Sequence, residues 1–382
     1  MKEKIVLVTA GGHISSFHAG MKKMHEVLEE KAPGRFELVG AKGGLKGLID
    51  GTFIPIRYED LDENRAGSMI GSDRNLAQTH EIARSVLDND VYAIVMMGGD
   101  NHLGEAEKCH DAGIRIVGYP KTMDGDLTSH ITLGWETAVT VGAMQTRYHY
   151  NSATTAGRVF YVGLFGRNTD WILAAVNAYG GGDIGIPCEQ KYKIEYILER
   201  VEAAFNRNKE RYGVGFAVVP YSEGAIIDGV SPPPDAHRST DKHDQVKIQP
   251  EWLGMELVRL TRGRGMDAAF QAHTYDMRDS PPTPTDKALS AMAGGACMDM
   301  ILDGDFGKSA IFVPDGNGFY TTKRGRLDVV SKQRFLKPTG HFNYGDMLTN
   351  PSFAKEYGPL FQTSLGGVPK KDDLVYKNMA RR

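Results

Sequence analysis

The fold is decided by residues 93–100, which read Ala-Ile-Val-Met-Met-Gly-Gly-Asp. Five consecutive apolar residues that end in two glycines are typical of a buried parallel strand that leaves its sheet through a tight turn. A helical pattern follows at residues 105–112, and a second apolar run occupies residues 114–118. Strand–helix–strand alternation of this kind predicts an α/β fold with a doubly wound, mostly parallel sheet.

The alternation extends toward the amino terminus. Strands are predicted at residues 5–8 and 36–40, and helices at residues 17–30 and 80–88. The first strand ends in Thr-Ala-Gly-Gly, so it leaves the sheet in the same way as residues 93–100. One sheet therefore accounts for the first third of the chain.

A second α/β domain is predicted after residue 134, where the alternation starts again. Strands are expected at residues 159–164 and 215–219, with an amphipathic helix at residues 194–209. A chain of 382 residues is long enough for two such domains. Three consecutive prolines and a dense polar mixture predict a loop at residues 231–247.

The composition excludes several classes of function. The net charge of −3 shows no basic excess, so we expect neither nucleic acid nor a membrane surface as a partner. No apolar run approaches the roughly 20 residues of a membrane span, and the run after Met-Lys-Glu-Lys is too short for a signal peptide. Three cysteines without close spacing are typical of a reducing compartment. The expected location is the cytoplasm.

Two glycine turns are the first candidate binding elements. Gly11-Gly12 and Gly98-Gly99-Asp100 both follow predicted strands. They should therefore lie at the carboxyl edge of the sheet, where α/β proteins bind ligands. Glycine lets backbone N–H groups approach a phosphate closely. A plain tight turn is the alternative, above all for the first pair, and neither segment is a Walker A loop or a complete dinucleotide fingerprint.

The next strand is followed by Pro-Lys-Thr-Met-Asp-Gly-Asp-Leu at residues 120–127 and Thr-Leu-Gly-Trp-Glu-Thr-Ala at residues 132–138. These segments closely resemble the phosphofructokinase pattern, Pro-Lys-Thr-Ile-Asp-(Asn or Gly)-Asp and then Gly-Phe-x-Thr-Ala, and the resemblance continues to about residue 300. It implies two doubly wound, Rossmann-like three-layer domains with the active site between them. The implied domains are a larger donor-binding domain, 1–134 plus 277–325, and a smaller sugar-phosphate-binding domain, 135–276 plus 326–382.

Phosphoryl transfer to a sugar hydroxyl requires a carboxylate that takes the proton, a metal ion that neutralises the phosphates, and cations around the moving group. Asp124 and Asp126 are separated by one glycine, so a turn can aim the first at the acceptor hydroxyl and the second at the metal. The resemblance implies catalytic roles for Asp124, Thr122 and Arg74, with Mg²⁺ held by Asp100 and Asp126. Such aspartates also cap helices or close turns, which is the alternative role.

The sugar-phosphate site is implied by the same resemblance. Its predicted residues match family motifs in order and spacing: Arg158, Phe165, Gly166, Arg167, Glu223, Tyr275 and Arg278. Arg158 matches an arginine that reaches the sugar phosphate of a neighbouring subunit, which implies a homodimer or homotetramer. Phe165 stands where the family usually has methionine. The expected acceptor is fructose 6-phosphate, with a related ketose phosphate such as sedoheptulose 7-phosphate as the alternative.

The donor site is predicted at Gly11, Gly12, Asn101 and Lys121. Pyrophosphate-dependent members typically have Gly-Gly-Asp-Asp and Asp-Gly-Asp-Leu, whereas ATP-dependent members typically have Gly-Gly-Asp-Gly and Asp-Asn-Asp. A carboxylate after Gly-Gly-Asp repels the α-phosphate of ATP, and a lysine occupies its space. Lys121 and the Asp-Gly-Asp-Leu segment favour pyrophosphate, while Asn101 blocks by bulk alone and should exclude ATP less strictly.

Three alternatives compete with this interpretation. The first is an ATP-dependent kinase of the same fold, and the second is a non-catalytic paralogue that binds sugar phosphate. The third is an NAD kinase, which shares the Gly-Gly-Asp turn. The presence of all four of Asp100, Asp124, Asp126 and Arg74 argues against a non-catalytic paralogue, because binding alone needs no base. Residues 120–126 argue against an NAD kinase.

Overall fold

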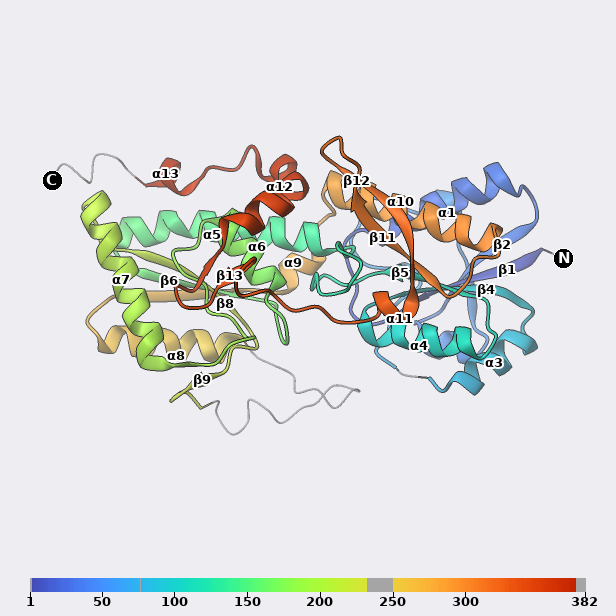
Figure 1. Ribbon diagram of the computed structural model, residues 1–382, viewed down its shortest axis with the longest axis horizontal. Helices are drawn as coiled ribbons and strands as arrows, with labels where there is room; N and C mark the ends of the chain where they lie inside the picture. Colours follow the sequence, from blue (N-terminus) through green and yellow to red (C-terminus); the bar gives the residue numbers. More distant parts are fainter. Residues whose placement is uncertain (1, 76, 232–249, 376–382) are drawn as a thin grey trace. The chain divides into compact units, whose positions relative to one another are not determined.

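The computed structural model describes residues 2–75, 77–231 and 250–375 (Figure 1). The chain divides into two compact units, each formed by two separate stretches of sequence. Unit 1 comprises Met1–Thr137 and Arg278–Arg334, and unit 2 comprises Ala138–Met277 and Phe335–Arg382.

The core of unit 1 is a seven-stranded sheet with the order β12-β11-β5-β4-β1-β2-β3. Its strands are β1 (Glu3–Thr9), β2 (Phe36–Ala41), β3 (Phe53–Pro55), β4 (Val91–Gly98), β5 (Ile116–Pro120), β11 (Lys308–Pro314) and β12 (Tyr320–Arg326). The five inner strands pair in parallel, and the two edge strands, β3 and β12, are antiparallel to their neighbours. The inner strands β1, β2, β4 and β5 are mostly buried, which explains why they read as apolar runs.

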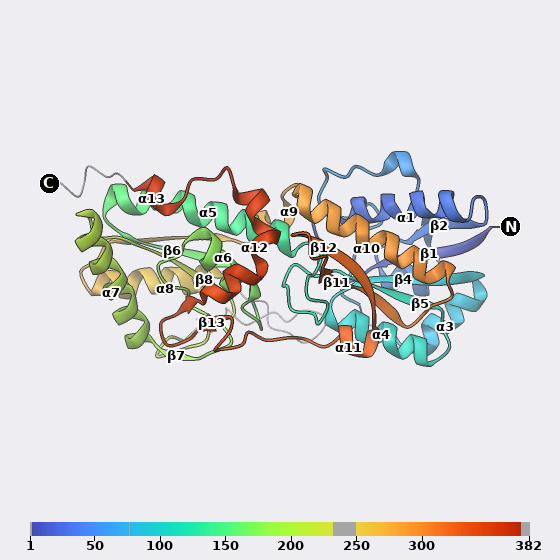
Figure 2. The ribbon, with the colours of Figure 1, turned by 45° about the horizontal axis from the view of Figure 1, so that its top comes forward.

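Helices cover both faces of this sheet (Figure 2). One face carries α1 (Phe17–Lys31) and α10 (Pro284–Leu302). These two helices approach closely at two glycines, since a β-carbon on Gly294 would lie 2.3 Å from the backbone oxygen of Gly20. The other face carries a single apolar cluster to which four helices contribute: α2 (Leu45–Ile49), α3 (Thr79–Asp88), α4 (Asp100–Asp111) and α11 (Leu327–Val330). Unit 1 is therefore a three-layer α/β domain.

Unit 2 is built on a three-stranded parallel sheet with the order β10-β6-β8. The strands are β6 (Val159–Leu164), β8 (Ala217–Ser222) and β10 (Ala268–His273). The first of these in the chain lies at the centre, so the sheet is wound in both directions from β6. Two short pairs accompany it: β7 (Tyr192–Lys193) with β9 (Ile227–Asp228), and β13 (Phe342–Asn343) with β14 (Leu348–Thr349).

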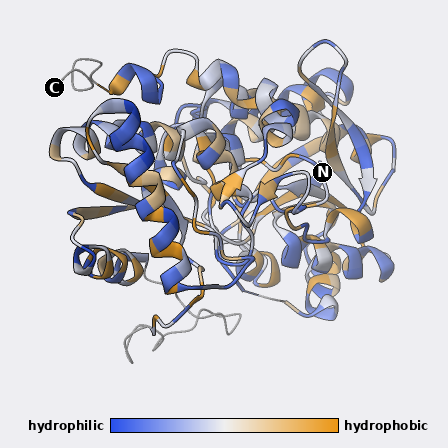
Figure 3. Ribbon diagram, turned by 60° about the vertical axis from the view of Figure 1, so that its left-hand side comes forward, coloured by the Kyte–Doolittle hydropathy of each residue, from blue (hydrophilic) through white to orange (hydrophobic). Residues whose placement is uncertain are grey.

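The helices of unit 2 are α5 (Trp135–Ala156), α6 (Trp171–Gly180), α7 (Ile194–Tyr212), α8 (Pro250–Gly263), α9 (Tyr275–Asp279), α12 (Pro351–Leu365) and α13 (Lys371–Leu374). The first three residues of α5 and the last two of α9, Arg278 and Asp279, belong to unit 1. Apolar residues of α7 and α8 form one cluster with the strands. Figure 3 shows apolar colour along the strands and a mixed pattern along α7, as expected for a helix with one buried face.

The predicted α/β fold is confirmed, and each predicted strand overlaps an observed one. One helix boundary was wrong: α4 begins at Asp100 rather than at residue 105. The polar residues that follow Gly99 carry no apolar periodicity, yet an acidic residue in the first turn stabilises a helix there. The hairpin of β11 and β12 was not predicted. The predicted polar loop at residues 231–247 lies, from residue 232 on, outside the described residues. Among the described helices, none has the length and apolarity needed to cross a membrane.

Candidate active site

The segment after β5 forms a tight turn that presents two carboxylates. We call residues 121–134 the signature loop. The hydroxyl of Thr122 donates to Oδ2 of Asp124 at 2.9 Å, and the N–H of Asp124 donates back to the same hydroxyl oxygen at 3.1 Å. Gly125 has φ +74°, and a β-carbon there would come within 2.7 Å of the Trp135 indole nitrogen. Glycine is therefore required at this position both by the backbone and by packing.

Two neighbouring carboxylates act electrostatically on Asp126. Asp126 is buried, and burial raises its pKa to about 7, assisted by the negative charges of Asp124 and Asp100. Asp100 is the first residue of α4, directly after the turn that ends β4. Burial and neighbouring negative charges destabilise the ionised form of a carboxylic acid. A bound cation therefore stabilises that ionised form strongly.

The acidic residues fit a magnesium ion that is shared with a substrate. No group of three or more His, Cys, Asp or Glu side chains within the described residues could enclose a metal ion by itself. Mg²⁺ is usually bound through one or two carboxylates plus substrate phosphates rather than by a complete protein cage. The burial of Asp126, together with the negative charges of Asp124 and Asp100 that raise its pKa further, is the observation that supports a cation here.

Lys121 connects the signature loop to the turn after β1. Its side chain is 2% exposed, and its ammonium group donates to the backbone oxygens of Ala10 and Gly12. Burial lowers the pKa of Lys121 to about 7; the positive charges of Arg278 and Arg74 act in the same direction, and Asp124 opposes them. The lysine predicted to contact the donor is therefore also a structural element of the Gly11–Gly12 turn.

Two arginines border the same turn. A β-carbon on Gly12 would lie 3.2 Å from the guanidinium carbon of Arg278, so the arginine side chain covers this glycine. The turn that carries Arg74 pairs directly with the first turn: the N–H of Gly11 donates to the backbone oxygen of Asp73 at 2.6 Å. Arg278, predicted to bind the sugar phosphate, thus lies in unit 1 beside the predicted donor turn.

Asn101 occupies the first turn of α4, next to Asp100, and is exposed. Its neighbour His102 lies near the first turn, since a β-carbon on Gly11 would be 3.8 Å from the imidazole carbon Cε1. The predicted donor residues therefore gather where the carboxyl ends of β1, β4 and β5 meet, as parallel-sheet ligand sites do.

In unit 2, the predicted sugar-phosphate residues follow the carboxyl ends of its three strands. Phe165 and Gly166 follow β6, Glu223 follows β8, and Tyr275 begins α9 two residues after β10. Phe165 and Tyr275 make an edge-to-face contact with ring centroids 5.9 Å apart. The N–H of Gly224 donates to the backbone oxygen of Gly166 at 2.9 Å, so the segments that carry Arg167 and Glu223 are held together.

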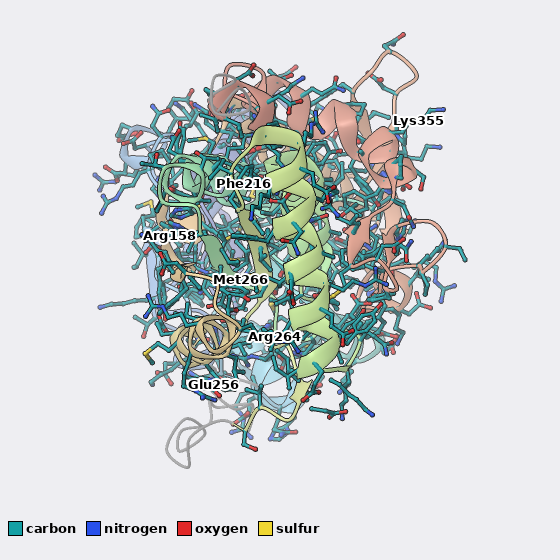
Figure 4. All side chains as sticks on the ribbon, turned by 90° about the vertical axis from the view of Figure 1, so that its left-hand side faces the viewer. Arg158, Phe216, Glu256, Arg264, Met266 and Lys355 are labelled. Carbon is teal, nitrogen blue, oxygen red and sulfur yellow. The ribbon has the colours of Figure 1, made fainter. Side chains whose placement is uncertain are left out.

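Arg158 lies apart from these residues within its own chain. It precedes β6, and therefore lies at the amino end of the strand whose carboxyl end carries Phe165. Its Nε lies 3.1 Å from an Asp267 carboxylate oxygen. Figure 4 shows Arg158, Phe216 and Met266, which come just before β6, β8 and β10 respectively. The predicted sugar-phosphate residues of unit 2 therefore lie together after the carboxyl ends of the strands, except Arg158, which lies at the amino end of β6.

The comparison with known families decides the identity of the fold. Residues 4–301 match the family described as Phosphofructokinase. The chain belongs to the phosphofructokinase family.

Phosphofructokinase relatives at similar distances carry names of both donor classes. The chain is 28% identical over 316 residues to the pyrophosphate–fructose 6-phosphate 1-phosphotransferase of Amycolatopsis methanolica, covering 80% of this chain and 89% of the relative. It is 30% identical over 321 residues to ATP-dependent 6-phosphofructokinase 2 of Streptomyces coelicolor, with the same two coverages. The chain is thus a phosphotransferase of this family that uses pyrophosphate or ATP.

Solved phosphofructokinase structures confirm the fold. The pyrophosphate-dependent phosphofructokinase from Marinobacter aquaeolei superposes with a TM-score of 0.77 over 94% of this chain and 91% of that one, at 18% identity. The phosphofructokinase of Saccharomyces cerevisiae gives a TM-score of 0.69 over 96% of this chain and 50% of that one, at 17% identity. At these identities the likeness concerns the fold alone.

Two groups of residues that support these phosphofructokinase segments were not predicted from the sequence. In unit 2, the buried carboxylate of Asp170 accepts hydrogen bonds from the Ser222 hydroxyl at 2.6 Å and from the N–H groups of Cys188 and Glu189. In unit 1, Gln333 and Arg334 contact the signature loop. The contacts of Asp170 join positions 18 to 52 residues apart and those of Gln333 and Arg334 more than 200, so no local pattern could have revealed either group.

Proposed function

We propose that the chain transfers a phosphoryl group from inorganic pyrophosphate to the 1-hydroxyl of fructose 6-phosphate, giving fructose 1,6-bisphosphate. The observation that carries this proposal is the hydrogen-bonded pair of Thr122 and Asp124 in the signature loop. One oxygen of the Asp124 carboxylate accepts from Thr122, which fixes the orientation of the group that must receive a proton.

The reaction then follows from the positions of these side chains. The sugar oxygen attacks the phosphorus atom of the donor while its proton passes to Asp124, and the bond to the departing orthophosphate breaks. Lys121, Arg74 and Arg278 supply positive charge beside the proposed donor turn. The charges of Arg278 and Arg74 lower the pKa of Lys121, and a bound anion would offset this repulsion. Catalysis of this kind depends mainly on positioning and charge stabilisation.

Mg²⁺ is the cofactor that we assign to this site, with Asp100 and Asp126 as its protein ligands. When bound, it neutralises charge on the phosphate oxygens. The burial of Asp126 beside two further carboxylates supports this assignment.

We assign the donor to unit 1 and the ketose phosphate to unit 2. Phe165, Gly166, Arg167, Glu223 and Tyr275 provide an aromatic pair, a guanidinium group and a hydroxyl acceptor at one edge of the unit 2 sheet. Arg158 lies at the opposite edge, which supports a contribution to the site of a second copy of the chain. A homodimer or homotetramer is therefore part of the proposal, and sedimentation of an active monomer at assay concentration would remove it.

Pyrophosphate is our preferred donor because Lys121 is buried against the first turn and Gly125 follows the proposed base. The names of three relatives at 26–28% identity agree with this choice. ATP is the second candidate. Two observations favour ATP as the donor. Asn101, which follows Asp100, is neutral. A relative at 30% identity is named as ATP-dependent.

A donor comparison tests the proposal. The purified protein is assayed with Mg²⁺ and fructose 6-phosphate, with pyrophosphate or ATP, and the product is identified by phosphorus NMR; sedoheptulose 7-phosphate serves as the competing acceptor. We expect kcat/KM for pyrophosphate to exceed that for ATP. A preference for ATP would assign the protein to the second candidate, and transfer to neither sugar would overturn the activity.

A further inference from the structure

A short segment before the end of unit 1 runs along the signature loop. We call residues 331–334 the strap. Leu127 and Gln333 form an antiparallel bridge, and the N–H of Arg334 donates to the backbone oxygen of Asp126 at 2.7 Å. Both the N–H and the hydroxyl of Thr128 donate to the backbone oxygen of Lys332, the hydroxyl at 2.8 Å. The strap therefore pairs with the loop almost as a neighbouring strand does.

The side chain of Arg334 adds a second set of bonds to the loop backbone. Its Nε and Nη2 donate to the oxygen of Gly125 at 3.0 and 2.7 Å, and Nη2 also donates to the oxygen of His130 at 2.8 Å. Gly125 and His130 both have positive φ, at +74° and +70°. For a non-glycine residue such as His130 this conformation is unfavourable and persists only when its surroundings hold it. One guanidinium group thus fixes the carbonyls of both left-handed residues.

The side chain of Gln333 acts on a carboxylate of the site. Its Nε2 donates to Oδ2 of Asp126 at 2.7 Å. A neutral amide orients this carboxylate without adding a charge that would compete with a cation. A lysine or arginine in the same place would form an ion pair with Asp126 instead.

We propose that Gln333 and Arg334 are positioning residues for phosphoryl transfer: Arg334 holds the backbone turn that carries Asp124, and Gln333 orients Asp126. This inference rests on the roles of those aspartates in the proposed function. The strap lies outside residues 4–301, the part of the chain that matches the family.

The test uses the unaltered chain, three variants of the strap and one control variant. Gln333→Met and Arg334→Met keep the length of each side chain and remove its hydrogen bonds. Arg334→Lys restores one cationic donor. Arg326→Met is the matched control, because Arg326 is in the same unit and pairs with Asp328 at the surface, with a side chain that is 74% exposed. Thermal unfolding first establishes that each variant is folded.

Amide hydrogen exchange and steady-state kinetics then test whether the strap positions the loop for the reaction. Without substrates or metal, we expect amide hydrogen exchange at residues 124–130 to become at least tenfold faster in Arg334→Met and to stay unchanged in the control. With substrates, kcat should fall about 10- to 100-fold in Gln333→Met and Arg334→Met, the usual cost of removing a group that orients a ligand. The KM for the sugar phosphate should stay within threefold, and Arg334→Lys should recover part of kcat.

Exchange and kcat within twofold of the unaltered protein in both methionine variants would overturn the proposal. Faster exchange with an unchanged kcat would also overturn it, because the strap would then hold the loop without serving the reaction. If the unaltered protein transfers no phosphoryl group from either donor, the proposed function fails. The exchange data would then still show whether the strap holds the loop.

Discussion

The ammonium group of Lys121 lies 2.6 Å from the backbone oxygen of Gly12, which ties the end of β5 to the turn after β1 across 109 residues of sequence. A second bond to the oxygen of Ala10 completes this link. Any change at Lys121 therefore affects both the positive charge beside this turn and the shape of the turn, which is the proposed donor site.

Lys121→Met should weaken pyrophosphate binding while the sugar phosphate site is retained. Losing a hydrogen bond to a charged group typically costs about 1.5–3 kcal/mol, which corresponds to a rise in the KM for pyrophosphate of roughly 10- to 150-fold. The two carbonyls left without their donor should also lower the melting temperature. Steady-state kinetics with each substrate varied in turn checks this. A KM for the sugar phosphate that rises as much as that for pyrophosphate would show a general collapse of the site instead.

Asn101 provides a prediction about the choice of donor. Asn101→Asp should lower kcat/KM for ATP by roughly tenfold, equivalent to about 1.4 kcal/mol of repulsion of a nucleotide phosphate, with a smaller effect on pyrophosphate. Lys108→Met is the matched control, since it changes the net charge by the same amount on an exposed position of α4. Equal losses with both donors, or a similar loss in the control, would show that position 101 does not select the donor.

The raised pKa of Glu189 should make the stability of the protein depend on pH. Burial raises its pKa to about 7, and the charge of Asp170 acts in the same direction, against hydrogen bonds from the N–H groups of Asp170 and Leu336. The folded protein therefore binds a proton more tightly than the unfolded chain, whose glutamates titrate near 4.5. Stability from this group is present below about pH 4.5 and is lost as the pH rises to about 7.

Glu189→Gln removes this titration. The difference in melting temperature, variant minus unaltered protein, should increase in favour of the variant from pH 5 to pH 8. Glu199→Gln, an exposed position on α7, is the control and should show a constant difference. A constant difference for Glu189→Gln as well would contradict the raised pKa.

The sequence was most informative where contacts are local. The apolar run before Gly98 predicted β4, and the spacing of Asp124 and Asp126 predicted a turn that separates two carboxylates. The alternation of strands and helices could therefore predict the α/β class. The edge hairpin of β11 and β12 was missed because its exposed, charged second strand lacks an apolar pattern.

The parts of the site that sequence analysis missed depend on long-range contacts. Arg334 donates to the backbone oxygen of Gly125, which lies 209 residues earlier in the sequence. No local sequence pattern around either residue predicts this contact. Asp170 resembles an ordinary helix cap in the sequence, yet in the structure its buried carboxylate accepts hydrogen bonds from two separate segments, residues 188–189 and Ser222. Lys121 was predicted as a donor contact only. Its bonds to two carbonyls depend on how β1 and β5 lie in the sheet.

The central claim is that Asp124 accepts the proton in phosphoryl transfer to the sugar. The most direct measurement is kcat of Asp124→Asn with saturating pyrophosphate, fructose 6-phosphate and Mg²⁺. Asp111→Asn, at an exposed position of α4, serves as the control. Asparagine keeps an oxygen that can accept from Thr122, so the turn should persist and the KM for the sugar phosphate should stay within about threefold. The account predicts that kcat falls by about 10² to 10⁴, the usual contribution of a general base. A kcat within tenfold of the unaltered protein would contradict it.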